Sequence, residues 1–400
     1  MLTRRGRVVL GLGFGVYVSA WAFGSKPLYP VAAGLLLVVA TAWVWVRLAK
    51  RPFHVRRGWG DTEHVEGDDV PVAVELEATA SVLPAAATLV ERVGRLGAQR
   101  HPLRRHGRRL SVRYVLGGLP RGRYTFGDVR IELADPFGLE RVAIELPAPG
   151  ALLVYPRLVR LGQLFSESGA TSHDGRRLLL RRNTGFELHG VREYEEGESL
   201  RRVHWRSTAR RGQLMVKELE DAPRDEIAVL LDADASAVVG ESFDVQVRAA
   251  GSLLDAYVRR GRRAVLVVNS ERREVQQVHA PAADWRRALE LLAAAEPTGR
   301  RPLARLLAED GGSAARALEL AVVTARLEQA LVDRLVQRSL SRRKVSLVYV
   351  EAPTFNGNAR RPEPLLLRLQ TAGIPVAVVR AGDELADALE GVGVAEAARA

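Results

Sequence analysis

Ile227-Ala-Val-Leu-Leu-Asp232 is an uninterrupted apolar run of strand length that ends on a carboxylate. An amphipathic helix is predicted directly after it, over Phe243 to Arg260, and short apolar runs continue to alternate with helical stretches. The further elements are expected at Arg263–Asn269, Ala283–Ala295, Leu318–Thr324, Val345–Val350 and Ile374–Val379. Strands that alternate with helices favour a doubly wound, mainly parallel sheet with ligand loops at the strand carboxyl ends. We therefore predict an α/β domain over residues 225–400.

The part of the chain that precedes this domain alternates apolar and polar residues, which is typical of strands with one buried face. Val70-Pro-Val-Ala-Val-Glu-Leu-Glu77 and Leu110-Ser-Val-Arg-Tyr-Val-Leu116 are clear examples. Asp135-Pro-Phe-Gly138 predicts a tight turn, because proline fixes φ and glycine can take positive φ. We predict a β-sandwich over residues 59–157, a linker over 158–184 and a charged segment over 185–224.

Two apolar stretches without charges begin the sequence. Val8 to Ser25 and Pro27 to Val46 each come close to the ~20 residues needed to cross a hydrocarbon core of ~30 Å. Only a short turn around Lys26 separates them. We therefore predict a two-helix transmembrane hairpin within residues 1–58, with spans at about 8–25 and 27–46.

The flanking charges predict the orientation of this hairpin. Arginines precede the first stretch at positions 4, 5 and 7, and five basic residues follow the second between Arg47 and Arg57. By the positive-inside rule both ends face the cytoplasm, which predicts a multi-pass plasma-membrane protein with cytoplasmic soluble domains. A cleaved signal peptide is the alternative for the first stretch, but the second apolar stretch follows it at once.

The formal charge of +12 raises nucleic acid as a partner. The excess is almost entirely arginine, since Lys26, Lys50, Lys217 and Lys344 are the only lysines. Such usage is typical of a GC-rich genome, so we do not expect nucleic acid as the partner. The chain has no cysteine, which excludes disulfides, thiolate metal sites and a Cys nucleophile.

Residues 192–210 form a dense cluster of Glu, Arg, His and Trp outside any simple periodic pattern. An enzymatic interpretation makes His204 a general base, with Glu193 or Glu198 as its partner. The structural interpretation pairs the Arg and Glu side chains and places Tyr194 and Trp205 in a seam between the two soluble domains. We favour the structural interpretation, because no Ser or Cys lies in the sequence pattern of a nucleophile elbow, the sharp strand-to-helix turn that exposes a catalytic nucleophile. We therefore expect no catalytic residues and no enzyme.

Asp232-Ala-Asp-Ala-Ser236 follows the first strand of the α/β domain and offers oxygen ligands for a hard cation such as Mg²⁺. A metal site there would use Asp232, Asp234 and Ser236. The loop after a later strand, Val322-Val-Thr-Ala-Arg326, adds no carboxylate, and Arg326 would repel a cation. We therefore predict a degenerate cation site and no firm cofactor.

Three segments in this order resemble the bacterial DUF58 family, membrane proteins with a von Willebrand factor A-like domain. They are Ala134-Asp-Pro-Phe-Gly-Leu139, Val154-Tyr-Pro-Arg157 and the stretch from Arg192 to Arg210. The last is similar to the family signature, and the signature residues here are Arg192, Tyr194, Gly197, Arg201, His204, Trp205 and Arg210. Glu198 stands where the signature usually has Asp, and the cation site typical of von Willebrand A domains is incomplete.

The resemblance implies a non-enzymatic role beside MoxR-type AAA+ ATPases and transglutaminase-like membrane proteins. We expect a membrane-tethered protein-interaction module that works in protein assembly or envelope maintenance. The main alternative is a divalent-cation-dependent, von Willebrand A-type ligand-binding domain. An enzyme centred on His204 and a nucleic-acid binder are the remaining alternatives.

Overall fold

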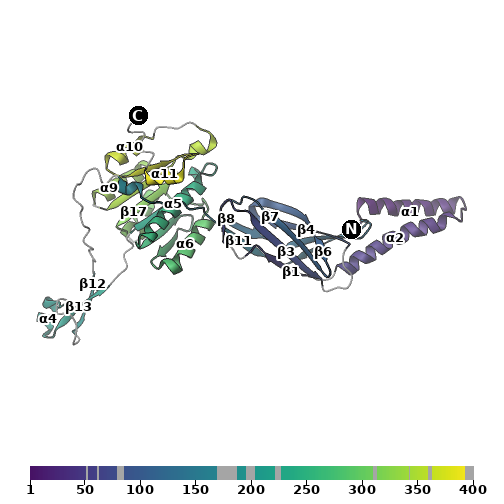
Figure 1. Ribbon diagram of the computed structural model, residues 1–400, viewed down its shortest axis with the longest axis horizontal. Coiled ribbons are helices and arrows are strands. Elements are labelled where there is room, and N and C mark those ends of the chain that lie inside the picture. The colour runs from purple at the N-terminus through teal and green to yellow at the C-terminus, as the bar shows by residue number, and fades with distance from the viewer. Residues whose placement is uncertain are drawn as a thin grey trace. The chain divides into compact units, whose positions relative to one another are not determined.

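The computed structural model describes residues 1–50, 53–60, 63–78, 85–168, 187–194, 203–220, 227–309, 313–341, 343–358 and 363–391. The chain divides into two compact units, Met1–Arg157 and Leu158–Ala400. Within the described residues, the first unit holds a pair of helices and two β-sheets. The second holds a six-stranded sheet with helices on both faces and a two-stranded sheet (Figure 1).

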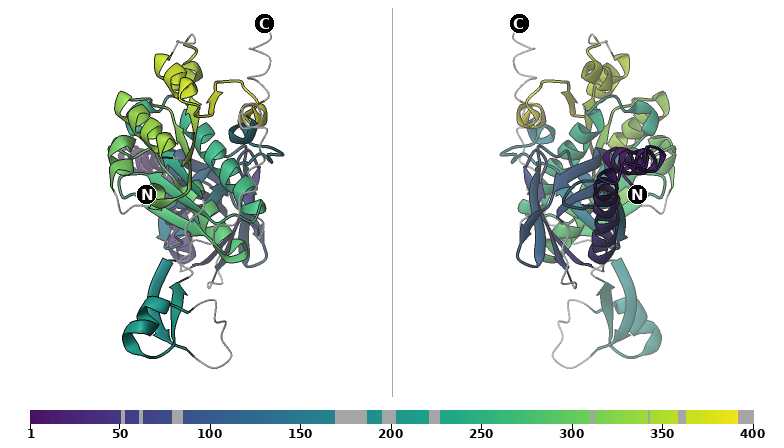
Figure 2. Two further views of the ribbon diagram at one scale, coloured as in Figure 1. Left: turned by 90° about the vertical axis from the view of Figure 1, so that its left-hand side faces the viewer. Right: turned by 90° about the vertical axis from the view of Figure 1, so that its right-hand side faces the viewer.

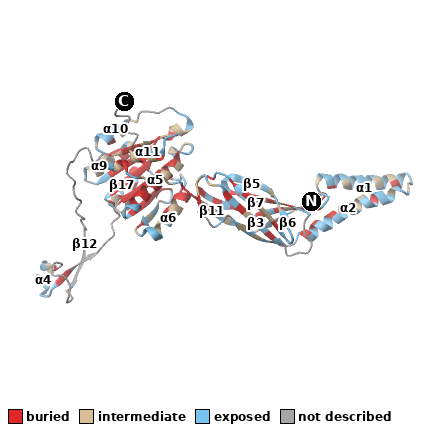
Figure 3. Ribbon diagram, viewed as in Figure 1, coloured by how far each residue is buried: buried red, intermediate tan, exposed pale blue. Residues whose placement is uncertain are grey.

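The N-terminal helices α1 (Arg4–Ala22) and α2 (Leu28–Ala49) pack side by side (Figure 2). They approach closely at Gly13, where an added Cβ would lie 3.2 Å from side-chain carbons of Leu35 and Leu36. Most of the other side chains of the pair are exposed, as the pale blue in Figure 3 shows. An exposed apolar surface of this extent is what a lipid-facing helix would present.

α2 is the one helix of the described residues that is long and apolar enough to cross a membrane by length and composition. A signal sequence close to the N-terminus would meet the same criterion. α1 is less apolar, because its first turn holds three arginines and its middle holds three glycines. The predicted membrane segment is thus confirmed as one candidate helix, and the second span of the hairpin stays a prediction.

Two sheets pack face to face in the rest of the first unit. One has the order β1-β3-β7-β6, and the other has the order β10-β9-β4-β8-β11-β2, with β5 paired to β4. The strands of the first sheet are β1 (Phe53–Gly58), β3 (Val70–Ala78), β6 (Arg104–His106) and β7 (Arg109–Leu116). Those of the second are β2 (His64–Val65), β4 (Ala86–Val93), β5 (Gly97–Pro102), β8 (Gly122–Phe126), β9 (Val129–Ala134), β10 (Arg141–Leu146) and β11 (Gly150–Tyr155).

The alternating residues of these strands bury one face of each sheet in a shared core. Val72, Val74 and Leu76 of β3 face Leu89 of β4 and Ile131 of β9 within one buried cluster. β1 pairs with β3 along its whole length, so the sandwich begins at Phe53, earlier than the predicted residue 59. The polar pattern of β1 (Phe-His-Val-Arg-Arg-Gly) masked its strand character in the sequence.

A charged cluster lies inside this sandwich. The guanidinium of Arg57 pairs with the carboxylate of Glu91, and their side chains are 4% and 0% exposed. Glu91 also accepts a hydrogen bond from the hydroxyl of Tyr114, whose ring stacks on His101. Arg57 further donates to the carbonyl oxygens of Ala148 and Gly127, at 2.5 and 3.3 Å. Burial, together with the carboxylate of Glu91, raises the pKa of Tyr114, so its phenol stays protonated.

The large sheet of the second unit has the order β16-β15-β14-β17-β18-β19. All neighbours are parallel except β15 and β16, so the predicted mainly parallel sheet is confirmed with one antiparallel edge strand. The strands are β14 (Ile227–Asp232), β15 (Ala264–Asn269), β16 (Glu274–Val278), β17 (Glu319–Thr324), β18 (Lys344–Val350) and β19 (Val376–Val379). The helices between them are α5 (Ser242–Arg259), α6 (Pro281–Ala294), α7 (Leu303–Ala308), α8 (Ser313–Arg316), α9 (Gln329–Leu340), α10 (Pro364–Thr371) and α11 (Leu385–Glu390).

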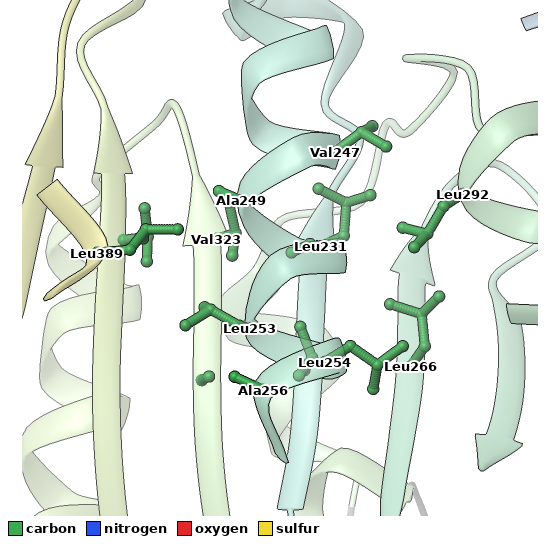
Figure 4. Close-up of a cluster of buried hydrophobic side chains, with 14 of the residues drawn as sticks. Leu231, Val247, Ala249, Leu253, Leu254, Ala256, Leu266, Leu292, Val323 and Leu389 are labelled. Atoms are coloured by element: carbon green, nitrogen blue, oxygen red, sulfur yellow. The ribbon is translucent and has the colours of Figure 1, made fainter. Parts of the chain in front are cut away.

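Both faces of this sheet are buried, which explains why its central strands are apolar throughout. The residues of β14 alternate between two clusters: Leu231 packs under α5 and α6, whereas Leu230 packs against α7 and α9. Figure 4 shows α5 laid across the first face, with Leu253 and Leu254 pointing down at the strands. This double cover holds the carboxyl ends of β14, β15 and β17 in fixed register.

The segment that follows the sandwich packs on the second unit rather than forming a free linker. Leu164 and Phe165, at the start of α3 (Phe165–Ser168), are buried in the cluster beneath α5. The N–H of Val159 donates to the hydroxyl of Ser252 in α5 at 3.0 Å. This differs from the linker predicted over 158–184, of which residues 169–184 lie outside the described residues.

Candidate functional site

Asp232 ends β14 at the carboxyl edge of the large sheet, and only 5% of its surface is exposed. One carboxylate oxygen accepts a hydrogen bond from the hydroxyl of Thr324 at 2.7 Å. The other accepts from the amide nitrogen of Asn269 at 3.2 Å. β14 lies between β15 and β17, and all three run parallel, so their last residues meet at one edge. The strand order therefore assembles a buried polar triad from three distant parts of the sequence.

Burial raises the pKa of Asp232 to about 6, although the hydrogen bonds from Thr324 and Asn269 act in the opposite direction. At neutral pH the carboxylate is therefore charged at a cost in stability. A titratable group that is perturbed by burial and lies at a ligand-binding edge is a candidate functional residue. This is the clearest electrostatic signal at the sheet edge.

Asp234 lies two residues further on, in the turn that leads to the short helix Ala235–Ala237. Its Oδ1 accepts from both the N–H and the hydroxyl of Ser236, at 2.9 and 2.8 Å. Its Oδ2 accepts from Nη1 of Arg326 at 3.1 Å, and Nη1 also donates to the Ser236 hydroxyl at 2.8 Å. Burial alone would raise the pKa of Asp234, but the hydrogen bonds from Ser236 and Arg326 outweigh it and lower that pKa.

Arg326 therefore holds the place that a divalent cation would need. Its guanidinium contacts Asp234 and Ser236, two of the three predicted metal ligands, and it pairs with Glu328 at 3.0 Å. Across the residues that the structure describes, no three His, Cys, Asp or Glu side chains gather in a way that could hold a metal ion. The side chains present do not fit Mg²⁺, because a fixed positive charge already satisfies the oxygens that would bind it.

An open pocket lies beside this ion pair. Its lining residues are Asp232, Asp234, Arg301, Pro302, Leu303, Arg326, Glu328 and Leu331. The carbonyl oxygen of Arg301 accepts the second hydrogen of the Asn269 amide at 2.8 Å, which joins the pocket to the buried triad. The side chain of Arg326 is half exposed, so its charge is accessible from solvent.

The described residues of the segment predicted over 185–224 form a two-stranded sheet and a short helix. β12 (Glu187–Glu193) and β13 (Met215–Glu220) pair antiparallel, and the short helix α4 (Trp205–Arg211) lies between them in sequence. His204 caps α4: its Nδ1 accepts from the N–H of Ser207 at 3.3 Å and lies 2.8 Å from the Ser207 hydroxyl. The N–H of His204 donates to the carbonyl of Met215 at 2.7 Å, and Thr208 accepts from the N–H of Met215 at 3.0 Å.

These contacts give His204 a local structural role, since its Nδ1 caps a helix and its backbone joins that helix to β13. Trp205 is 67% exposed, and its predicted place in a seam between the two soluble domains stays a prediction. Tyr194 is half-buried and its N–H donates to the carbonyl of Leu214 at 2.9 Å. Arg210 is exposed in the last turn of α4. The predicted signature residues Gly197 and Arg201, the side chain of Arg192, and Glu198 lie outside the described residues.

Two contributors to the sheet-edge site, Asn269 and the carbonyl of Arg301, were not found in the sequence, and a third, Arg326, was given another role. Asn269 ends β15 in the same register as Asp232 ends β14, and this shared position is the signal that identifies it. The sequence indicated that Arg326 would repel a cation, but not that its guanidinium would occupy the cation's place beside Asp234 and Ser236. The carbonyl of Arg301 depends on a loop whose path the sequence does not predict.

Three known proteins illustrate the similarities of this chain. It is 25% identical to the uncharacterized protein YeaD of Bacillus subtilis (strain 168) over 223 residues, 56% of this chain and 55% of YeaD. The chain thus matches about half the length of that curated relative. The PilB minor pilin from Streptococcus sanguinis gives a TM-score of 0.29 at 7% identity, covering 81% of this chain and 89% of the pilin.

A β-glucosidase from Listeria innocua, solved with gluconolactone, gives a TM-score of 0.15 at 10% identity, covering 24% of this chain and 16% of the enzyme. Neither structural likeness is strong enough to support an argument about fold or function. The family comparison is more informative, because it spans the signature segment and the sheet-edge site together. Residues 190–353 match the family model described as "Protein of unknown function DUF58".

Proposed function

We propose that the protein is a membrane-tethered, non-enzymatic protein-interaction module that works with a MoxR-type AAA+ ATPase in protein assembly or envelope maintenance. A transglutaminase-like membrane protein is a further proposed partner. The resemblance to the DUF58 family supports both partners. The sheet order, with its antiparallel edge strand β16, supports a von Willebrand A-like interpretation of the α/β domain.

The tether in this proposal is the helical hairpin α1–α2, with both ends in the cytoplasm. α2 supports it by its length and apolar surface, and the arginines that flank the two helices support the orientation. The cytoplasmic side is also where an ATPase would find its nucleotide. This topology makes the protein a multi-pass plasma-membrane protein whose soluble domains lie in the cytoplasm.

One observation carries the proposal: Arg326 supplies a fixed positive charge at the sheet edge. In a cation-dependent domain of this type, the bound metal would present positive charge to the ligand. Here the guanidinium is held by Asp234, Ser236 and Glu328 and remains half exposed. A planar guanidinium is suited to bind a carboxylate of a partner protein. The proposed interaction is therefore independent of metal.

Co-purification tests this proposal. The full-length chain is captured from detergent extracts, with the ATPase hexamer stabilised by a non-hydrolysable nucleotide and its Mg²⁺. We expect the ATPase to be recovered with the wild type, several-fold less with Arg326→Gln, and undiminished with Arg334→Gln, a matched change at an exposed arginine of α9. Failure to recover the ATPase with the wild type would contradict the proposal.

A cation-dependent binding domain is the second candidate, because Asp232, Asp234, Ser236 and Thr324 bring several oxygens to one edge. The contacts of Arg326 disfavour it. Calorimetric titration of the full-length chain with Mg²⁺ or Mn²⁺ separates the two candidates. Saturable heat that Asp232→Ala abolishes would support the second candidate and count against the first.

A further inference from the structure

The turn between β9 and β10 presents an aromatic side chain on a rigid backbone. Both oxygens of the Asp135 carboxylate are used inside the turn, accepting from the N–H groups of Phe137 and Glu140 at 2.8 and 2.6 Å. Gly138 takes a φ of +67°, which favours glycine there. Phe137 is 61% exposed at this turn, while Leu139 is buried. The turn thus directs one large apolar ring outward.

The same turn is fixed against the two N-terminal helices, which belong to the same compact unit. Leu139 packs in a cluster with Val9 of α1 and with Val38, Val39 and Ala42 of α2. The N–H and the hydroxyl of Thr3 donate to the carbonyls of Leu139 and Gly138, at 2.8 and 2.7 Å. At Gly6, an added Cβ would overlap the carbonyl oxygen of Leu139, so glycine permits this close approach.

These contacts set the depth of the turn along the helices. The α2 residues that contact Leu139, from Val38 to Ala42, precede Arg47 by nine to five residues, or about 7.5–13.5 Å along the helix. Val9 follows Arg7 by two residues, or about 3 Å along α1. Leu139 therefore lies on the apolar side of the arginines that end the charge-free stretches. If α2 crosses a bilayer, the turn lies at the boundary between headgroups and acyl chains, where amphipathic segments bury their apolar side chains by about 5–10 Å.

The charges around the turn complement a lipid surface. Arg4, Arg5 and Arg7 of α1 are exposed, as is Arg141 at the start of β10. Arg141 pairs its backbone with Met1, and Leu2 pairs with Glu140, which keeps these arginines beside the turn. Arginines at this level would contact anionic phosphates while Phe137 entered the apolar layer beneath them.

We propose that the Asp135–Glu140 turn is a lipid-contact site, with Phe137 inserted at the headgroup–acyl boundary and Arg4, Arg5, Arg7 and Arg141 bound to anionic headgroups. The site would fix the sandwich against the membrane surface. This inference rests on the proposed membrane attachment. It adds a second contact with lipid that involves no part of α2 and, of α1, only its arginine-rich start.

A fluorescent depth probe tests the inference, because the chain has no native cysteine to compete for the label. Phe137→Cys is labelled with an environment-sensitive fluorophore in the full-length chain and reconstituted in phosphatidylcholine–phosphatidylglycerol vesicles. Thr125→Cys is the control, an exposed position on β8, which Figure 1 shows at the end of the sandwich away from α1 and α2. Nitroxide-bearing lipids quench only a probe that lies in the bilayer, and aqueous iodide quenches only an exposed one.

We expect emission at shorter wavelength and several-fold stronger quenching by nitroxide lipid at position 137 than at position 125. Leaving out the anionic lipid should weaken this quenching, and equal quenching would contradict the headgroup contacts. A probe at 137 that iodide quenches as strongly as at 125, or that neither quencher reaches, would overturn the inference. Flotation separates failure of this inference from failure of the proposed membrane attachment. If the chain does not float with vesicles, the attachment itself is wrong. If the chain floats but the probe at position 137 is exposed to water, the attachment holds and only this inference fails.

Discussion

Asp232→Asn is the substitution that most sharply tests the electrostatics of the sheet edge. Asparagine resembles the protonated acid, with one acceptor oxygen and one donor group, so it can keep a hydrogen bond to either Thr324 or Asn269. It differs from the wild type only where the carboxylate would be charged. The comparison therefore isolates the cost of burying this charge.

The expected difference in the free energy of unfolding follows from the pKa of Asp232. Burial raises the folded-state pKa of Asp232 to about 6 from an ordinary value of 3.8. The folded state then binds more protons than the unfolded state between these two values, so stability falls as pH rises through this window. At 1.36 kcal/mol for each unit, the fall amounts to about 3 kcal/mol. Below pH 4 the protonated Asp232 contributes its full share to the free energy of unfolding, and above pH 7 this contribution is lost.

Urea unfolding of the full-length chain in neutral detergent, from pH 4 to pH 7.5, measures this effect. Hydrogen exchange of β14 amides reports on the α/β unit, because the chain's six tryptophans are spread over several of its parts. Asp232→Asn should match the wild type at pH 4 and exceed its stability by up to about 3 kcal/mol at pH 7. Adding MgCl₂ in place of NaCl at equal ionic strength should not change the wild type. Parallel pH profiles for the two proteins would refute the burial argument.

Three further predictions concern other parts of the molecule. Glu91→Gln leaves the buried Arg57 without its counter-charge and should destabilise the sandwich by about 3–5 kcal/mol. Hydrogen exchange of β4 amides measures this loss. The control Glu75→Gln, at an exposed position of β3, should change stability by less than about 0.5 kcal/mol. Unchanged protection after Glu91→Gln would contradict the role of this pair. Arg326→Ala removes two partly exposed ion pairs and should lower the free energy of unfolding by only about 1 kcal/mol. It also frees Asp234 and Ser236, so calorimetry should detect weak Mg²⁺ binding that the wild type lacks. Equal heats of Mg²⁺ titration for the two proteins would contradict this prediction. Leu139→Ser removes the apolar contact with Val39 and Ala42 and should increase hydrogen exchange in β9 and β10 near the turn. The control is Val115→Ser, at an exposed valine of β7, which should leave this exchange unchanged.

The sequence predicted those elements whose side-chain pattern follows directly from their packing. β14 has the predicted bounds Ile227–Asp232, because both of its faces are buried and every residue is apolar up to the carboxylate. β16 was not predicted, since its Glu-Val-Gln-Gln-Val pattern belongs to an edge strand that is mostly exposed. β19 is shorter than predicted at its start, where Pro375 has no N–H to donate to a ladder.

The candidate site depended more strongly on tertiary structure. Asp232, Asp234 and Ser236 were found from their spacing, and their neighbours Asn269 and Thr324 became partners only through the strand order. Arg326 changed the interpretation most, because its position beside Asp234 turns a predicted repulsion into an internal ion pair.

The proposed function is a metal-independent interaction through Arg326 by a protein held in the membrane. The most direct test is equilibrium binding of a MoxR-type ATPase, with non-hydrolysable nucleotide and Mg²⁺, to the full-length chain in lipid nanodiscs. We predict saturable binding that Arg326→Gln weakens several-fold and Arg334→Gln leaves unchanged. Binding that Arg326→Gln leaves unchanged, or no binding to the wild type at all, would overturn the proposed function.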